Sequence, residues 1–203
     1  LAYRCCFVPG CNSTYILKVL RNQNFMDSDS KRIGKIFVTE EEIRARVKEL
    51  GAQITQDYEG KKPLLIGVLK GAFIFMADLI REIDLESDVD FMAVSSYGAA
   101  TRSSGVVRII KDLDADLTDR DVIIVEDIID SGLTLSYLKK NLLARFPASL
   151  EVCAMFVKEG LQKTNDKVKY EGFMIPPDFV VGYGLDAAEK YRGLSYLAAY
   201  LED

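Results

Sequence analysis

The chain has 203 residues, 49% of them hydrophobic and 28% charged, with a formal net charge of −5. This composition is ordinary for a globular protein with one sizeable core, and the negative balance disfavours a nucleic-acid partner. No apolar run reaches the roughly 18–20 residues that span a bilayer, so we expect a cytoplasmic protein without a membrane partner.

Residues 1–32 differ in character from the rest of the chain. Pro9-Gly10 interrupts the only candidate for a signal-peptide hydrophobic region, and Asp27-Ser-Asp-Ser30 has the composition of a solvated linker. Three of the four cysteines lie in the first eleven residues, which is too uneven for a disulfide framework, and the chain has no histidine to complete a zinc site. We predict an N-terminal extension outside the core, with the domain itself in residues 33–203.

The next segments predict a helix, a buried strand and a second helix. Thr39 and Glu42 have the spacing of a capping box at the start of an amphipathic helix over residues 40–58. Its apolar face is formed by Ile43, Val47, Leu50 and Ile54. The apolar run Leu64–Leu69 predicts a strand that is buried on both faces. A helix with Phe73, Ile74, Ala77 and Ile80 follows and ends near Ile83.

The alternation of strands and helices continues to about residue 157. Further strands are predicted at Val89–Ser95, Val106–Ile110, Val122–Val125 and Val152–Val157, and a helix with Leu135, Leu138, Leu142 and Phe146 ends before Pro147. This order implies right-handed crossovers and an α/β fold: a mainly parallel, twisted sheet with helices on both faces.

The C-terminal part contains short strands without helices between them. They are predicted at Lys169–Ile175, Phe179–Tyr183 and Tyr196–Tyr200. We expect these strands to form a small C-terminal hood lobe that caps the sheet, made by about residues 33–38 and 171–203.

Three carboxylates and a tight turn follow the predicted strand Val122–Val125. In an open parallel sheet, ligands bind at the carboxyl ends of the strands, where Glu126, Asp127 and Asp130 are expected. The turn Asp130–Thr134 leads into a helix N-terminus, where free backbone N–H groups favour an anion. Carboxylates repel phosphate, so we expect them to bind sugar hydroxyls, hold Mg²⁺ or move a proton.

Two simpler interpretations compete with this one. Asp130 or Ser131 could serve only as the cap of the following helix. An apolar run that ends in Glu-Asp could also be the magnesium-binding half of a nucleoside triphosphatase, but the chain lacks the G-x-x-x-x-G-K-[ST] loop, and it lacks the G-x-G-x-x-G of a dinucleotide site. From the residues alone, the prediction is a pocket for a phosphate together with a sugar or a metal ion.

The stretch V-I-I-V-E-D-I-I-D-S-G-L-T (122–134) resembles the phosphoribosyl-pyrophosphate-binding motif of the type I phosphoribosyltransferases. L-L-I-G-V-L-K-G-A (64–72), S-S-Y-G (95–98) and P-D-F-V-V-G-Y-G-L-D (177–186), which precedes a Y-R pair, extend the resemblance over roughly residues 33–200. The match is to the purine-salvage members of this family, and more to their bacterial forms.

The resemblance implies the type I phosphoribosyltransferase fold and an enzyme that forms a homodimer or homotetramer. Its substrates would be phosphoribosyl pyrophosphate and a 6-oxopurine base, with Mg²⁺ as cofactor. The 5-phosphoribosyl group would move to hypoxanthine or guanine through an oxocarbenium-like transition state, giving IMP or GMP and pyrophosphate. A non-catalytic relative that senses phosphoribosyl pyrophosphate is the alternative of another class, and the net charge of −5 disfavours its binding to nucleic acid.

The resemblance also implies the residues that bind the ribose and its phosphate. Glu126 and Asp127 would bind the ribose hydroxyls, and Asp130 would be the general base for the purine. Asp186 would join Glu126 and Asp127 as a metal ligand. The 5-phosphate would be held by the turn residues Ser131, Gly132, Leu133 and Thr134.

The leaving group and the purine are assigned in the same way. Pyrophosphate would bind at Lys70 and Gly71, in a turn with a non-proline cis peptide, and at Arg192. A mobile lid would follow Ser96 and Tyr97 over residues 98–105. The resemblance assigns the purine to Lys158 for its exocyclic oxygen, Phe179 for stacking and the Val180 carbonyl for a 2-amino group.

Overall fold

The computed structural model describes residues 32–96, 107–161, 164 and 166–201. The predicted extension before residue 32 and the predicted lid over residues 98–105 lie outside these ranges. No helix in the ranges is both long enough and apolar enough to cross a bilayer.

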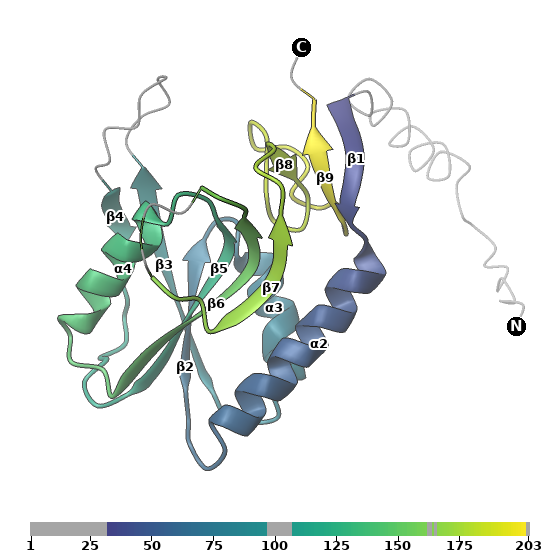
Figure 1. The fold of residues 1–203 in the computed structure, drawn as a ribbon. Coiled ribbons are helices and arrows are strands. Elements are labelled where there is room, and N and C mark those ends of the chain that lie inside the picture. The colour runs from purple at the N-terminus through teal and green to yellow at the C-terminus, as the bar shows by residue number, and fades with distance from the viewer. Residues whose placement is uncertain (1–31, 97–106, 162–163, 165, 202–203) are drawn as a thin grey trace, which may run out of the picture.

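A six-stranded sheet with the order β4-β3-β2-β5-β6-β7 forms the centre of the molecule (Figure 1). Its strands are β2 (Leu64–Leu69), β3 (Asp88–Ser96), β4 (Val107–Lys111), β5 (Asp121–Ile129), β6 (Ser149–Lys158) and β7 (Tyr170–Ile175). Only β4 runs antiparallel to its neighbour, and the other pairs in this sheet are parallel. The predicted α/β fold with a mainly parallel sheet is therefore confirmed.

Helices cover both faces of this sheet (Figure 1), namely α2 (Glu40–Asp57), α3 (Phe73–Glu82) and α4 (Leu133–Leu143). Strand β5, which is buried from Val122 to Glu126, supplies both cores, because successive side chains of a strand point to opposite faces. Ile123 and Val125 pack with α2 and α3, whereas Val122 and Ile124 pack with α4.

Helix α2 begins as predicted. Thr39 Oγ1 accepts a hydrogen bond from the Glu42 backbone N–H, and the Glu42 carboxylate accepts one from the Thr39 backbone N–H at 2.8 Å. This capping box satisfies two amides that a helix start leaves without partners. The four predicted apolar positions of the helix are buried, namely Ile43, Val47, Leu50 and Ile54.

A three-stranded antiparallel sheet forms the smaller lobe, with the order β1-β9-β8. Its strands are β1 (Ile33–Val38), β8 (Val180–Val181) and β9 (Leu197–Tyr200). We call this sheet and the loop of residues 182–196 the hood. The hood packs on the large sheet where the ring of Tyr183 meets that of Phe156 in β6, with centroids 6.4 Å apart.

Two strands differ from the prediction. The strand predicted at Lys169–Ile175 was assigned to the hood, but β7 extends the large sheet in parallel to β6. Tyr170 and Ile175 explain this placement, because both are buried in the core beneath α2 and α3. Strand β5 continues to Ile129, four residues beyond its predicted end at Val125. The carboxylates Glu126 and Asp127 therefore belong to the strand itself.

Two helices also differ in detail. The apolar face of α3 is formed by Phe75, Met76 and Leu79, and Phe73 is half exposed. Helix α4 ends at Leu143, so Phe146 lies beyond it in a left-handed conformation (φ 55°) with 76% of its surface exposed. The prediction that Phe146 belongs to the apolar face of this helix is wrong.

Candidate active site

A cleft of about 800 Å³ opens at the carboxyl ends of β2, β3 and β5, beside the hood. It brings together ten of the predicted site residues, namely Lys70, Gly71, Glu126, Asp127, Asp130, Ser131, Gly132, Thr134, Asp186 and Arg192. They come from separate stretches of sequence, and the strand ends bring them to one edge, where parallel sheets bind ligands.

The turn after β5 is shaped to present backbone amides. Gly132 adopts a left-handed conformation (φ 75°) and is the N-cap of α4, where no side chain makes a capping hydrogen bond. The interpretation of Asp130 or Ser131 as only a helix cap is therefore wrong. The first amides of α4 have no acceptor within the helix, and the helix dipole favours an anion at this position.

Glu126 and Asp127 form a buried pair of neighbouring carboxylates. Glu126 is 6% exposed, and Asp127 Oδ1 accepts a hydrogen bond from the Ile128 backbone N–H at 2.8 Å. Burial raises the pKa of Glu126 well above its usual range, and the charge of Asp127 raises it further. Burial also raises the pKa of Asp127 to about 6. The pair lies where a cation or hydroxyl donors would stabilise its charged form.

Asp130 and Lys158 meet at the purine side of the predicted site. Lys158 is buried at the end of β6, and its Nζ donates to Oδ2 of the exposed Asp130 at 3.2 Å. A carboxylate at the edge of the cleft can reach a ligand, while the lysine beside it fixes its orientation. The structure therefore joins the two predicted residues, although Lys158 does not line the cleft directly.

Close backbone contacts hold the turn after β2. The Leu69–Lys70 peptide bond is cis, at the turn where the resemblance implied one. A Cβ atom added to Gly71 would overlap the carboxylate of Asp127, and one added to Gly184 would overlap the Gly71 carbonyl oxygen. The two glycines thus let β5, the turn and the hood loop meet without side chains between them.

Cations and carboxylates from the turn and the hood face each other across the cleft. Lys70 Nζ lies 3.1 Å from Glu189 Oε1, and Arg192 lies 2.7 Å from Asp186 and 3.4 Å from Glu189. Arg192 also donates to the Gly184 carbonyl at 2.8 Å. Its buried Nε atom has no hydrogen-bond partner among the described residues.

Glu189 was missed by the sequence reasoning. Its carboxylate contacts both cations that the resemblance assigns to pyrophosphate, Lys70 and Arg192. No sequence pattern pairs Glu189 with a lysine 119 positions away. Its place in a loop of left-handed residues, with Ala188 and Tyr191 also at positive φ, is equally invisible in the sequence.

Phe179, Val180 and Leu133 lie outside the lining of the cleft. Phe179 is 49% exposed and packs edge-on against Tyr200 at 5.7 Å, and Val180 is buried in β8. Leu133 is the exposed first residue of α4, and Ser96 ends β3. Tyr97 lies outside the described residues.

The predicted metal ligands do not form a closed metal site. Within the described ranges, no three carboxylate, thiolate or imidazole groups are placed to hold a metal ion among themselves. Glu126, Asp127 and Asp186 all line the cleft, but they do not converge on one point as a structural metal site requires. Any ion here would need ligands from substrate or water.

The fold and the cleft can be compared with known proteins. Residues 37–188 match the phosphoribosyl transferase domain family. The chain therefore belongs to the phosphoribosyltransferase family. Within that family its relatives include the hypoxanthine-guanine phosphoribosyltransferases of Mycobacterium tuberculosis and Bacillus subtilis. The first is 54% identical over 171 residues, which cover 81% of this chain and 85% of the relative. The second is 53% identical over 165 residues, which cover 81% of this chain and 92% of the relative.

Solved structures agree with these relatives. A hypoxanthine-guanine phosphoribosyltransferase from Bacillus anthracis is similar with a TM-score of 0.79 and 45% identity, over 83% of this chain and 99% of that one. A hypoxanthine phosphoribosyltransferase from Staphylococcus aureus gives a TM-score of 0.81 and 44% identity, over 85% and 94%. The fold implied by the resemblance of the sequence is thus confirmed.

Proposed function

We propose that the chain is a purine-salvage transferase that moves the 5-phosphoribosyl group from phosphoribosyl pyrophosphate to hypoxanthine or guanine. The products are IMP or GMP and pyrophosphate. The observation that carries this proposal is the cleft at the end of β5, where an anion-binding turn, a carboxylate pair and a Lys–Asp pair lie side by side. The identity to hypoxanthine-guanine phosphoribosyltransferases supports the choice of a purine.

Each group suits a different part of the sugar substrate. The amides of the turn Ser131–Thr134 bind the 5-phosphate at the start of α4. Glu126 and Asp127 accept hydrogen bonds from the ribose 2- and 3-hydroxyls, which are donors that a buried carboxylate can use. Lys70 and Arg192 bind the pyrophosphate, with further amides from the turn at Gly71. This division gives the sugar hydroxyls to the carboxylate pair and the phosphates to backbone amides and cations.

The charges fit the reaction. As the bond from the anomeric carbon to pyrophosphate breaks, positive charge grows on the ribose and negative charge on the leaving group. The Glu126–Asp127 pair lies on the side of the positive charge, and Lys70 and Arg192 lie on the side of the negative charge. Asp130 takes the proton that the purine nitrogen loses as it bonds to the anomeric carbon, and Lys158 orients that carboxylate.

The carboxylates of the cleft also fit Mg²⁺, which is a hard cation that prefers oxygen ligands. Burial raises the pKa values of Glu126 and Asp127, so a cation beside them would stabilise their charged forms. Asp127 and Asp186 would hold the ion, and substrate oxygens and water would complete its shell, because Mg²⁺ usually keeps several waters. Bound there, it would neutralise charge on the departing pyrophosphate.

The contacts of the purine are less sharply defined. Lys158 contacts the cleft only through Asp130, and Phe179 and Val180 belong to the hood side rather than to the cleft lining. We propose that Phe179 stacks on the purine, because its exposed face is free to do so.

The homodimer or homotetramer, the lid and the cytoplasmic location stay predictions.

Pyrophosphate release tests the proposal directly. The protein is mixed with Mg²⁺, phosphoribosyl pyrophosphate and one of hypoxanthine, guanine, xanthine, adenine or uracil. We expect release with hypoxanthine or guanine and none with adenine or uracil. Binding of phosphoribosyl pyrophosphate without release for any base would favour the alternative, a non-catalytic sensor.

A further inference from the structure

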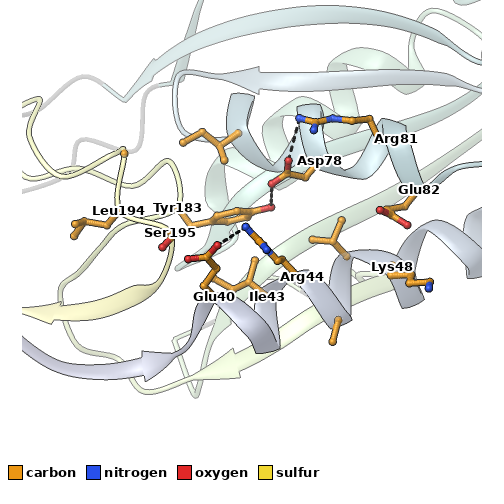
Figure 2. Close-up of a pocket in the computed structure, with 14 residues that line it drawn as sticks. Glu40, Ile43, Arg44, Lys48, Asp78, Arg81, Glu82, Tyr183, Leu194 and Ser195 are labelled. Carbon is orange, nitrogen blue, oxygen red and sulfur yellow. Dashed lines mark hydrogen bonds and ion pairs between the residues drawn. The ribbon is translucent and has the colours of Figure 1, made fainter. Parts of the chain in front are cut away.

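A second cavity, of about 660 Å³, lies where α2, α3 and the hood meet. Figure 2 shows the phenol of Tyr183, from the hood, pointing at the carboxylate of Asp78 on α3. The phenol oxygen donates to Asp78 Oδ2 at 2.8 Å, and Asp78 Oδ1 accepts from Arg81 at 3.2 Å. The reaction proposed above uses neither Tyr183 nor Asp78.

The surroundings of Tyr183 favour its hydrogen bond to Asp78. Tyr183 is 5% exposed, and its burial and the neighbouring charge of Asp78 raise the pKa of its phenol, so the hydroxyl stays a donor at physiological pH. The ring packs nearly perpendicular to that of Phe156 at 6.4 Å. The ring would therefore stay in place without its hydroxyl, so the hydrogen bond can be removed by itself.

The Asp78 end of this bond is fixed to the turn of Lys70 and Gly71, which we propose to bind pyrophosphate. Helix α3 follows Lys70 and Gly71 directly, with hydrogen bonds from the Ala72 amide to the Val68 carbonyl and from the Phe73 amide to the Lys70 carbonyl. Asp78 lies roughly one and a half helical turns further along. Because a helix is stiff over this length, the position of Asp78 follows that of the turn.

The other end is fixed to the loop that carries Arg192. Tyr183 donates its amide to the Leu194 carbonyl at 2.8 Å, and its neighbour Gly184 exchanges hydrogen bonds with Arg192, amide to carbonyl at 2.9 Å and guanidinium to carbonyl at 2.8 Å. The backbone of Gly184 lies against the Gly71 carbonyl. Tyr183 thus moves with Arg192, as Asp78 moves with Lys70.

The apolar packing of Tyr183 with α3 has no fixed direction, and two further links between these segments are weak. The Lys70–Glu189 ion pair joins side chains that are 67% and 66% exposed, and pairs of this kind contribute little in water. The contact of Gly184 with Gly71 is between backbones and involves no hydrogen bond between these two described residues. The bond from Tyr183 to Asp78 is better shielded from water, because the phenol is 5% exposed and the Asp78 side chain 39% exposed.

We propose that Tyr183 is a positioning residue that sets the separation of Lys70 and Arg192, by bonding the hood to α3. This inference rests on the proposed function, because it assumes that the two cations bind one pyrophosphate. Two groups that must bind one ligand lose affinity for it when their spacing is free to vary. The purine side, at Asp130 and Lys158, is carried by β5 and β6 and does not depend on the bond.

The test compares two tyrosine variants. Tyr183→Phe removes the bond, and we expect the KM for phosphoribosyl pyrophosphate and the Kd for pyrophosphate to rise about tenfold, the effect of one hydrogen bond to a charged group. The KM for hypoxanthine should stay within about twofold. Tyr170→Phe is the matched control, because the buried Tyr170 also donates to a carboxylate, Asp57, at 2.8 Å but lies far from the cleft.

Asp78 provides the reciprocal measurement. Asp78→Ala should reproduce the effect of Tyr183→Phe, Asp78→Asn should restore much of the affinity through its amide oxygen, and the double variant Tyr183→Phe/Asp78→Ala should be no worse than Asp78→Ala. Unchanged affinity for pyrophosphate in Tyr183→Phe, or an equal loss in Tyr170→Phe, would overturn the inference. A wild-type protein that turns over no 6-oxopurine would instead refute the proposed function.

Discussion

The carboxylate of Asp127 lies directly against the backbone of Gly71, in the space that a Cβ atom at position 71 would occupy. The residue of β5 that we propose to bind the sugar and the turn that we propose to bind pyrophosphate are therefore packed together. Because glycine has no side chain, Asp127 and the turn at Gly71 can pack in direct contact. The proposed binding groups for the sugar and for pyrophosphate therefore belong to one rigid part of the protein.

Gly71→Ala should therefore disable the site. The new methyl group would displace either the buried Asp127 or the turn, and overpacking of this kind costs about 1–3 kcal/mol of stability. We expect turnover to fall at least about a hundredfold, because small displacements of binding groups have that effect. Gly193→Ala is the control, since a Cβ added there meets no atom within 4 Å. Normal turnover by Gly71→Ala would show that the turn adapts freely.

Asp130→Asn tests whether Asp130 is the general base that we propose. The amide keeps the shape of the side chain but cannot take a proton, so we expect the rate of purine transfer to fall about 10²–10⁴-fold. Binding of phosphoribosyl pyrophosphate should change little, and isothermal titration measures it separately. Asp178→Asn, at an exposed aspartate that precedes β8, is the control. If Asp130→Asn turned over normally, another group would have to accept the proton.

The buried carboxylate pair predicts a pH-dependent stability difference. Asp127 has a pKa of about 6 in the folded protein, above the ordinary value near 3.8, so the folded state holds its proton more tightly than the unfolded chain does. Its contribution to stability is present below about pH 4 and is lost as the pH rises through 6. Other carboxylates, such as Asp88, have lowered pKa values and act in the opposite direction, so a single curve is uninformative.

A comparison with Asp127→Asn measures this contribution together with the effect of the Asp127 charge on Glu126. The neutral variant should gain stability relative to the wild type between pH 4 and pH 7, by about 3 kcal/mol for a shift of two pKa units at Asp127. Urea unfolding of the ligand-free proteins at four pH values measures the difference. A difference that is constant over this range would mean that the carboxylate is not destabilised by burial. Adding phosphoribosyl pyrophosphate with Mg²⁺ should reduce the stability difference between the variant and the wild type.

Glu189→Gln should improve the binding of phosphoribosyl pyrophosphate. The Glu189 carboxylate bonds to Lys70 and lies 3.4 Å from Arg192, so it competes with the pyrophosphate for both cations. Exposed ion pairs are worth up to about 1 kcal/mol, so we expect the KM to fall about two- to fivefold. Steady-state kinetics at low salt measure it, with Glu59→Gln, at the other end of the sheet, as control. A raised KM would show that Glu189 helps to bind the substrate.

Phe146→Asn should stabilise the protein. Phe146 is largely exposed and adopts a left-handed conformation, which asparagine tolerates better than a bulky residue does. We expect a gain of about 0.5–1 kcal/mol in the free energy of unfolding. Leu143→Asn, at the exposed end of α4, serves as the control and should give no gain. A loss of stability in Phe146→Asn would indicate that the ring has a packing role.

Much of this fold could be predicted because its signals are local. The capping box at Thr39 and the apolar run Leu64–Leu69 each need only neighbouring residues, and both are observed as expected. The placement of β7 could not be predicted, because a short apolar strand fits a small lobe as well as a sheet edge. Strand β7 belongs to the large sheet because its side chains are buried beneath α2. This contact joins segments that are far apart in the sequence, so no local pattern reveals it.

The site residues also fall into those that local sequence predicts and those that depend on distant segments. The residues of the central motif are consecutive, so their gathering at the end of β5 follows from one strand and one turn. Glu189, Tyr183 and Asp78 act through partners more than a hundred positions away, as in the Tyr183–Asp78 bond. Their positions depend on how the hood loop folds, and its positive φ angles at Ala188 and Glu189 leave no mark in residue type.

The pairing of β1 with β9 bears on how the protein folds. Arg32 and Tyr200, which share a hydrogen bond at 3.0 Å, are 168 residues apart, whereas the strands of the large sheet join much nearer neighbours. Contacts between such distant residues form late, because the loop that they close is long. The hood should therefore be the last part to assemble and the first to open. Native-state hydrogen exchange would then show β1 and β9 exchanging together, well before β2 and β5.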